Sequence, residues 1–499
     1  MNIPLTKKPL QPRVGIYSVG LKAYWPQFEG LRERLIRYGK FIENRISADA
    51  SVFNYGMVDS SDEARKAGEW FNSHNVDIVF CHAATYCSSD CVLPVHQICK
   101  APFVVLNLQP AARVNYAKTS TGEWLAHCGA CPVPEFSNAF NRAGLGFESI
   151  NGLLGLDKSP EISVTDEVTN ERPEAIKAWR QIREYVKAAG VKRMLQHARF
   201  GFLGNTFNGM LDMYSDLTML QGQLGIHVEI IEMSNLYHYF KTVTDEEIKE
   251  KQNLINDFFI ISGDSAADPI TKKPTAEQLE WSARVAVAQE KMVRDYDLDA
   301  LTYYYHGADD DIFEQIQGGF IVGHSLLTAS GIPCAGEGDI KTNAAMKICD
   351  YLNVGGSYSE IVTTDYMDGT ILLGHDGPFH IAISNKKPIL RGMKLYHGKR
   401  GLGVSVEAKV APGPITTLGV TQNHGGSLKM IISEGEATDG EIMQVGNTQT
   451  PVRFSVDPDT YFYKWFKEAP THHCAMSVGH NAELFTKVAT MMNIPCCVL

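Results

Sequence analysis

The chain of 499 residues is long enough for about three domains at roughly 150 residues each. Its 44% hydrophobic and 21% charged residues are typical of a globular protein and exclude a disordered or collagen-like chain. The formal net charge of -11 has the wrong sign for a protein that neutralises nucleic-acid phosphates, so we expect no nucleic-acid partner.

No apolar run reaches the length of about 18 residues that a membrane span needs, and the first residues lack the apolar stretch of a secretory signal. We therefore expect a cytoplasmic protein without a membrane partner. The odd number of cysteines, 11, indicates reduced thiols rather than a disulfide framework. Cys128 and Cys131 have CxxC spacing but no second such pair, which favours ordinary thiols over a metal site.

Residues 1–110 alternate between strand and helix patterns. Apolar runs of strand length lie at 14–20, 51–58, 76–80 and 102–108. Amphipathic helices are predicted at 28–46 and from a cap at Ser60 or Ser61 to about residue 74. Such a βαβαβ series predicts a parallel sheet with helices on both faces. The polar, helical segment 151–192 is typical of a connection between domains.

A second alternating series follows. Its predicted strands are 200–204, 227–231 and 298–305, and its predicted helices are 245–259, 275–295 and 340–352. Asp339 is the expected N-cap of the last helix. Neither GxGxxG nor a P-loop occurs in the chain, so no motif indicates nucleotide binding.

The sequence pattern changes after residue 355, where short segments of alternating apolar and polar residues are separated by Gly, Pro and Asn. These segments are 370–373, 380–384, 403–410, 416–420 and 428–433, with a closing helix at 482–492. They predict a mainly antiparallel sheet or barrel. The expected fold class is therefore α/β, with two doubly wound parallel α/β domains followed by a mainly antiparallel β C-terminal domain. The expected boundaries are 1–190 for a flavodoxin- or Rossmann-like domain, 191–354 for a central α/β domain and 355–499 for the β-rich domain.

Four segments place ionisable residues beside glycine or proline, a composition expected where backbone approaches a ligand. They are Gly336–Asp339, Ser357–Glu360, Leu373–Gly377 and Pro470–Cys474. Two carboxylates and two imidazoles that converge would bind a divalent cation, and such oxygen and nitrogen ligands favour manganese, cobalt or magnesium over structural zinc. Each residue alone has an ordinary alternative, because a Glu in a glycine loop is more often a cap or a surface charge.

These segments occur in an order that resembles bacterial L-arabinose isomerase and, more broadly, the arabinose and fucose isomerase superfamily. The matching residues are Ala335–Thr342, Gly355–Ser357, Glu360, Leu373–His375 and Thr471–His473. In the N-terminal part, Leu125–His127 with Gly129, and later Glu135 and Phe136, resemble a further segment of the family. The order of the three expected domains also fits the family's plan.

The resemblance implies a divalent cation, typically Mn²⁺ with Co²⁺ or Mg²⁺ as alternatives. The residues that it implies as ligands are Glu337, Glu360, His375 and His473. The two glutamates would double as catalytic acid and base, and our hypothesis makes Glu337 the base and Glu360 the acid partner.

The resemblance also implies an assembly. His127 matches a histidine that reaches the substrate of a neighbouring subunit, which implies a homo-oligomer, usually a hexamer, with active sites at subunit interfaces. Met210 and Asp212, which follow a predicted strand, and His472 are further candidates for substrate binding.

The chain departs from the family pattern in three places. Residues 18–25 lack the family's glutamine-containing sugar loop, and His375 follows Gly374 where the family inserts one residue. The connection between Glu337 and Glu360 is also shorter, which leaves Asp365 as a rival for the second carboxylate.

We expect a metal-dependent aldose–ketose isomerase that converts a small sugar through an enediolate, with L-arabinose to L-ribulose as the leading reaction. Alternatives within this chemistry are an L-fucose-type isomerase, another pentose or hexose isomerase, or an epimerase. A different class is a non-catalytic sugar-binding protein, since two α/β domains around a cleft also describe ligand-binding modules.

Overall fold

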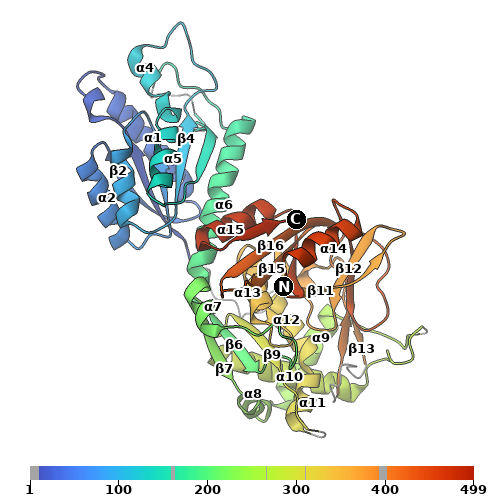
Figure 1. The fold of residues 1–499 in the computed structure, drawn as a ribbon. Helices are drawn as coiled ribbons and strands as arrows, with labels where there is room; N and C mark the ends of the chain where they lie inside the picture. The colour runs from blue at the N-terminus through green and yellow to red at the C-terminus, as the bar shows by residue number, and fades with distance from the viewer. Residues whose placement is uncertain (1–9, 159–162, 266, 309–310, 393–401) are drawn as a thin grey trace. The chain divides into compact units, whose positions relative to one another are not determined.

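The computed structural model describes residues 10–158, 163–265, 267–308, 311–392 and 402–499 (Figure 1). The chain divides into two compact units, Leu10–Arg193 and Met194–Leu499. Within the described ranges, none of the helices combines the length and apolar character that crossing a bilayer would require.

The N-terminal unit contains a parallel five-stranded sheet with the order β2-β1-β3-β4-β5, which is the flavodoxin-like order. Its strands are β1 (Arg13–Val19), β2 (Ser51–Val58), β3 (Ile78–His82), β4 (Phe103–Gln109) and β5 (Ser149–Leu153). Its helices are η1 (Lys22–Tyr24), α1 (Leu31–Ile46), α2 (Ser61–Ser73), η2 (Ser89–Cys91), α3 (Leu93–Ile98), α4 (Thr121–Leu125), η3 (Cys128–Ala130), α5 (Val133–Arg142) and α6 (Pro173–Leu195). The parallel α/β prediction for this part is confirmed.

Two local differences from the prediction have physical causes. Helix α1 begins at Leu31 rather than at residue 28, because Gly30 has a left-handed φ of 82° just before it. Strand β5 was not expected, since its residues look polar. It lies at the edge of the sheet and pairs only with β4, so the burial of Ile150 and Leu153 is enough to hold it.

The second unit begins with a parallel sheet of order β10-β9-β6-β7. Its strands are β6 (Arg199–Gly204), β7 (His227–Ile231), β9 (Ala300–Tyr304) and β10 (Cys334–Ala335). The accompanying helices are α7 (Leu217–Leu224), α8 (Met233–Phe240), α9 (Asp245–Phe258), α10 (Ala276–Asp295), α11 (Ile312–Gly318), α12 (Phe320–Ala329) and α13 (Ile340–Tyr351). The carboxyl ends of β6, β9 and β10 lie side by side, where open α/β sheets bind their ligands.

The rest of this unit is a closed antiparallel barrel, drawn in orange and red in Figure 1. In ring order its strands are β15 (Gly413–Gln422), β18 (His473–Val478), β11 (Gly355–Asp365), β12 (Thr370–His375), β17 (Thr448–Phe454) and β16 (Leu428–Ala437). The ring closes because β15 pairs with both β18 and β16, and closure leaves these strands without a free edge. The mainly antiparallel β prediction is confirmed.

Smaller elements surround the barrel. They are β8 (Ile260–Ile261), η4 (Ile381–Ile383), β13 (Ile389–Arg391), β14 (Ser405–Glu407), α14 (Pro458–Lys467), α15 (Ala482–Met492) and β19 (Cys496–Val498). Residues 380–384 were expected to form a strand but contain the 3-10 helix η4. Phe379, Ile381 and Ile383 alternate as a strand would, yet the segment packs on α12, where the amide of Phe379 donates to the hydroxyl of Ser325.

One continuous hydrophobic core joins the central sheet and the barrel. It includes Tyr303 on β9, Phe320 on α12, Leu373 on β12 and Met476 on β18, all buried. The proposed division at residue 354 therefore lies within a unit whose two layers share one core, and the three-domain boundaries stay a prediction.

Strands β12 and β17 approach each other closely at Gly374. A Cβ atom at this position would lie 1.7 Å from the carbonyl oxygen of Thr448. Because the obstacle is strand backbone rather than a flexible side chain, β12 cannot accept a larger residue there without separating from β17.

We expect Gly374→Ala to lower the free energy of unfolding by about 3 kcal/mol or more, as overpacking against backbone does. Thermal or urea unfolding measures the effect. Gly222→Ala is the matched control, because a Cβ at this exposed position of α7 meets no atom within 4 Å. This variant is expected to be neutral or up to about 1 kcal/mol more stable. Equal unfolding curves for both variants would contradict the close approach.

Candidate active site and metal centre

Glu337 lies in the tight loop that follows β10. Its backbone has a left-handed φ of 62°, which is rare for a residue other than glycine and is often found at functional sites. Gly338 also has a positive φ, and a Cβ on it would lie 2.4 Å from the carbonyl oxygen of Asn205. The amide of Gly338 donates to Tyr303, and Glu337 accepts from the amide of Phe207. The loop is thus held between the ends of β6 and β9.

The barrel register brings the other predicted ligands together. In β11, Glu360 lies opposite Gly374 of β12 on one side and opposite His473 of β18 on the other. His375 is the last residue of β12, and His473 is the first residue of β18. Three adjacent strands therefore present their polar side chains at one end of the barrel.

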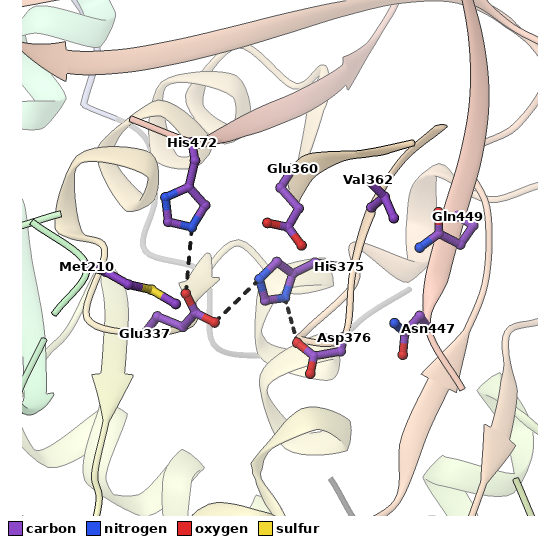
Figure 2. Close-up of a pocket in the computed structure, with 9 residues that line it drawn as sticks. All are labelled: Met210, Glu337, Glu360, Val362, His375, Asp376, Asn447, Gln449 and His472. Carbon is purple, nitrogen blue, oxygen red and sulfur yellow. Dashed lines mark ion pairs between the residues drawn. The ribbon is translucent and has the colours of Figure 1, made fainter. Parts of the chain in front are cut away.

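The carboxylate of Glu337 faces the Nε2 atoms of three imidazoles. Its oxygens lie 3.5 Å from His473, 3.8 Å from His375 and 3.9 Å from His472. Figure 2 shows His375 and His472 on two sides of this carboxylate, with Glu360 beside His375. These separations are too long for direct hydrogen bonds.

Three overlapping groups of side chains could hold a metal ion. Within each group the ligand atoms lie within 4.8 Å of one another. The groups are Glu337 with His472 and His473, Glu360 with His375 and His473, and Glu337 with His375 and Asp376. The structure thus brings all four predicted ligands to one place. Carboxylate and imidazole donors without a thiolate fit a divalent cation of the manganese, cobalt or magnesium kind.

Glu337, Glu360, His375, Asp376 and His472 line a cavity of about 240 Å³. The lining residues are Met210, Glu337, Glu360, Val362, His375, Asp376, Asn447, Gln449 and His472. Among these described lining residues there are three carboxylates and no Lys or Arg, so a bound cation would compensate their charge.

Burial and nearby carboxylates have opposite effects on the two ligand histidines of the barrel. Burial lowers the pKa of His473 to about 3, despite the neighbouring Asp339, so this ring is neutral at neutral pH. Burial also opposes protonation of His375, but Asp376, 3.1 Å from its Nδ1, and Glu337 raise its pKa overall. A metal needs the neutral imidazole in both cases, so cation binding would displace any proton from His375.

Two buried residues hold His473 in place. Its Nδ1 lies 3.0 Å from the carboxylate of Asp339 and 2.8 Å from the hydroxyl of Tyr358, which itself donates to the carbonyl of Gly336. Asp339 also accepts from the amide of Thr342, which confirms it as the N-cap of α13. The same aspartate therefore begins a helix and positions a candidate ligand.

His472 and Asp212 form a second contact between the barrel and the central sheet. The Asp212 carboxylate lies 2.6 Å from Nδ1 of His472 and accepts from its backbone amide at 3.0 Å. Burial acts against both charges, but each partner favours the charge of the other, so the pKa of Asp212 is lowered and that of His472 is raised. Met210, two residues before Asp212, lines the cavity.

Two other candidates lie elsewhere. Asp365 is at the far end of β11, where its carboxylate accepts from the amides of Met367 and Asp368 in the hairpin turn, so it is not among the converging residues. His127 lies in the N-terminal unit, directly before η3, where burial lowers its pKa. Its Nε2 has no hydrogen-bond partner among the described residues.

Sequence reasoning missed several residues of the cavity. Asp376 was within one of the four polar segments, but nothing in the pattern distinguished it from its neighbour His375. Asn447 and Gln449 flank the start of β17 and read as ordinary polar residues of a strand. Tyr358 reads as a residue of the sheet core, and no sequence signal indicates that its hydroxyl contacts His473.

Comparison with known families finds a match in the central part of the chain. Residues 215–355 match the family model of the L-arabinose isomerase central domain, a range that includes Glu337 and its loop. The match indicates an isomerase. The likeness to arabinose isomerases that the sequence motifs predict is thus supported over the central part of the chain.

Other comparisons add little. A search of curated proteins finds no match to the chain. A periplasmic solute-binding protein of an ABC transporter from Actinobacillus succinogenes 130z, with bound D-allose, is 11% identical, with 65% of this chain and 78% of that chain covered and a TM-score of 0.17. A sugar-binding protein of a sugar ABC transporter from Bacillus halodurans is 10% identical, with 71% and 90% covered and a TM-score of 0.15.

We expect Tyr358→Phe to destabilise the protein by about 1–2 kcal/mol, because it removes a buried hydroxyl that contacts both Gly336 and His473. Thermal unfolding measures the change. Tyr366→Phe is the control, since its exposed hydroxyl contacts only the surface residue Asp459. If the two variants unfold at the same temperature, the contacts of the Tyr358 hydroxyl with Gly336 and His473 do not contribute to stability.

Proposed function

We propose that this protein is a divalent-cation-dependent aldose–ketose isomerase, with L-arabinose to L-ribulose as the leading reaction. The observation that carries the proposal is the convergence of Glu337, Glu360, His375 and His473. The first three of these residues line one cavity. The match of the central domain to L-arabinose isomerases supports it.

The proposed cation is Mn²⁺, with Co²⁺ or Mg²⁺ as alternatives, held by the four converging residues. When bound, it would act as a Lewis acid toward the carbonyl and the adjacent hydroxyl of the sugar. The neutral ring of His473 and the carboxylates of Glu337 and Glu360 supply nitrogen and oxygen donors that suit these ions.

The chain's own residues would move the protons. Glu337 takes the proton from the carbon next to the carbonyl, and the electron pair of the broken C–H bond forms the enediol double bond. Glu360 transfers the hydroxyl proton between the two oxygens, and a proton returned to the former carbonyl carbon completes the ketose. General acid–base steps of this kind contribute about 10²- to 10⁴-fold each. Glu337 is buried, lines the cavity and faces three imidazoles, which places its carboxylate where the base must act.

The cavity favours a small neutral sugar. Its volume of about 240 Å³ is below the range of about 300–1,000 Å³ that is usual for larger ligands, so one monosaccharide is the fitting size. Three carboxylates and no Lys or Arg in the described lining disfavour a phosphorylated or acidic sugar. The side-chain oxygen of Gln449 is buried without a hydrogen-bond partner among the described residues and can accept from a sugar hydroxyl.

The resemblance in sequence extends the proposal to location and assembly. We propose a cytoplasmic homo-oligomer, a hexamer in its leading form, in which His127 contributes to the substrate site of a neighbouring subunit. Met210, Asp212 and His472 would contribute to substrate binding from within the subunit.

We expect purified protein with Mn²⁺ to convert L-arabinose to a ketose in a panel of aldoses, with the product identified by chromatography. Glu337→Gln and Glu360→Gln should each reduce turnover by at least about 10²-fold, because the amide cannot take up or release the proton. Asp365→Asn is the matched control and should keep the wild-type rate, since this carboxylate lies in the hairpin turn. A Glu337→Gln enzyme with a near-native rate would refute the proposed base, and preferential conversion of L-fucose or another aldose would reassign the substrate.

Removal of metal distinguishes the two candidate functions, a metal-dependent isomerase and a non-catalytic sugar-binding protein. We expect EDTA to abolish turnover and to lower the melting temperature, and Mn²⁺ at about 100 times its Kd to restore about 2.7 kcal/mol of stability. Differential scanning calorimetry with and without Mn²⁺ measures this shift. A protein that binds sugar equally well before and after EDTA, and melts at the same temperature, would instead be a binding module.

A further inference from the structure

Three histidines at the cavity share one arrangement of partners. In each ring, Nδ1 lies close to an aspartate carboxylate, and the pairs are His375 with Asp376 at 3.1 Å, His473 with Asp339 at 3.0 Å and His472 with Asp212 at 2.6 Å. In each ring, Nε2 lies 3.5–3.9 Å from an oxygen of Glu337. Figure 2 shows this arrangement for His375, with Asp376 on one side and Glu337 on the other.

In a neutral imidazole, the position of the single proton decides which ring nitrogen has a free lone pair. Such a ring carries one N–H, and a carboxylate next to Nδ1 favours the form with the proton on that atom. Asp212 and Asp339 lie at hydrogen-bond distance and geometry from the Nδ1 atoms of His472 and His473, whereas Asp376 lies at ion-pair distance from His375. The lone pair of Nε2 is then directed at Glu337, which as a carboxylate has no proton to donate. A lone pair and a carboxylate at 3.5–3.9 Å are both satisfied by a cation between them.

The Asp212–His472 pair places a third imidazole beside the four residues of the proposed metal set. His472 and Asp212 are each 37% exposed at the side chain, so this ring depends on its partner for orientation more than the buried His375 and His473 do. Asp212 contacts both the ring and the backbone amide of His472, which fixes the position and the rotation of the ring together.

We propose that His472 is an additional cation ligand and that Asp212 and Asp376 are positioning residues, which hold the Nδ1 protons of His472 and His375 so that both Nε2 atoms face the ion. The inference rests on the cation of the proposed function. It adds a third imidazole to that cation's ligands and assigns to two aspartates a role in metal affinity.

The test uses the full-length protein with Mn²⁺ alone as the probe. Pulsed electron paramagnetic resonance detects the nitrogen nuclei of coordinated imidazoles, and a titration gives the Kd. We expect three coordinated nitrogens in the wild type and two in His472→Ala. Loss of an orienting carboxylate weakens metal binding by about 10- to 100-fold, so Asp212→Ala and Asp376→Ala should each raise the Kd by that factor.

Two further variants distinguish an effect on the orientation of the His472 ring from an effect on folding. Asp212→Asn keeps an oxygen that accepts from Nδ1, so its Kd should lie between those of the wild type and Asp212→Ala even if the alanine variant folds poorly. Asp368→Ala, an exposed aspartate in the β11–β12 turn, should bind Mn²⁺ as the wild type does. Melting curves of the metal-free proteins verify that each variant is folded.

The outcomes distinguish this inference from the proposed function. Two nitrogens in the wild type, with an unchanged signal and Kd in His472→Ala and Asp212→Asn, would overturn the inference while the four-residue metal set stands. Absence of Mn²⁺ binding by the wild type would overturn the cation itself and the inference with it. Three nitrogens in the wild type that fall to two in His472→Ala would support it.

Discussion

The site depends on the position of one buried carboxylate. Glu337 lies in a loop with two successive left-handed residues, between the ends of two parallel strands, and the adjacent backbone of Asn205 leaves no space for a Cβ at the following glycine. Its side chain meets imidazoles that come from the first and last residues of barrel strands. The central sheet, which carries the loop, and the barrel, which carries the strands, share one hydrophobic core.

Closure of the barrel is the second requirement. Glu360 and His473 are paired in register across β11 and β18, so a shift of one residue would turn one of them away from the cavity. Gly374, the residue before His375, lets β12 approach β17 closely next to the site. The positions of Glu360, His375 and His473 therefore follow from strand pairing, whereas that of Glu337 follows from its loop.

Much of this arrangement could be predicted from the sequence. Helices with strong capping signals, such as those that begin after Ser60 and Asp339, were located within a residue or two. The polar segments beside glycine or proline contained Glu337, Glu360, His375 and His473, and the resemblance to arabinose isomerases selected these four as ligands. Strand β5 and the 3-10 helix η4 were missed, since edge strands need few apolar residues and an alternating pattern does not by itself distinguish a strand from a short helical turn.

The partners of the histidines could not be predicted in the same way. The hydrogen bond between Asp212 and His472 joins residues 260 positions apart, and only the packing of the central sheet against the barrel brings them together. Asp376 is next to His375 in the sequence, but its importance depends on the rotation of the imidazole ring, which no pattern of residue types specifies.

Strand β18 also bears on the selectivity of the cation site proposed above. Cys474 directly follows His473, and the alternation of a strand directs its thiol into the hydrophobic core on the opposite face. The thiol is 1% exposed, and burial raises its pKa to about 12, so it stays protonated. A soft sulfur ligand is thereby kept out of a site only one residue away. Copper(I) and cadmium ions, which prefer thiolates, gain no advantage there over the harder ions that carboxylates and imidazoles bind.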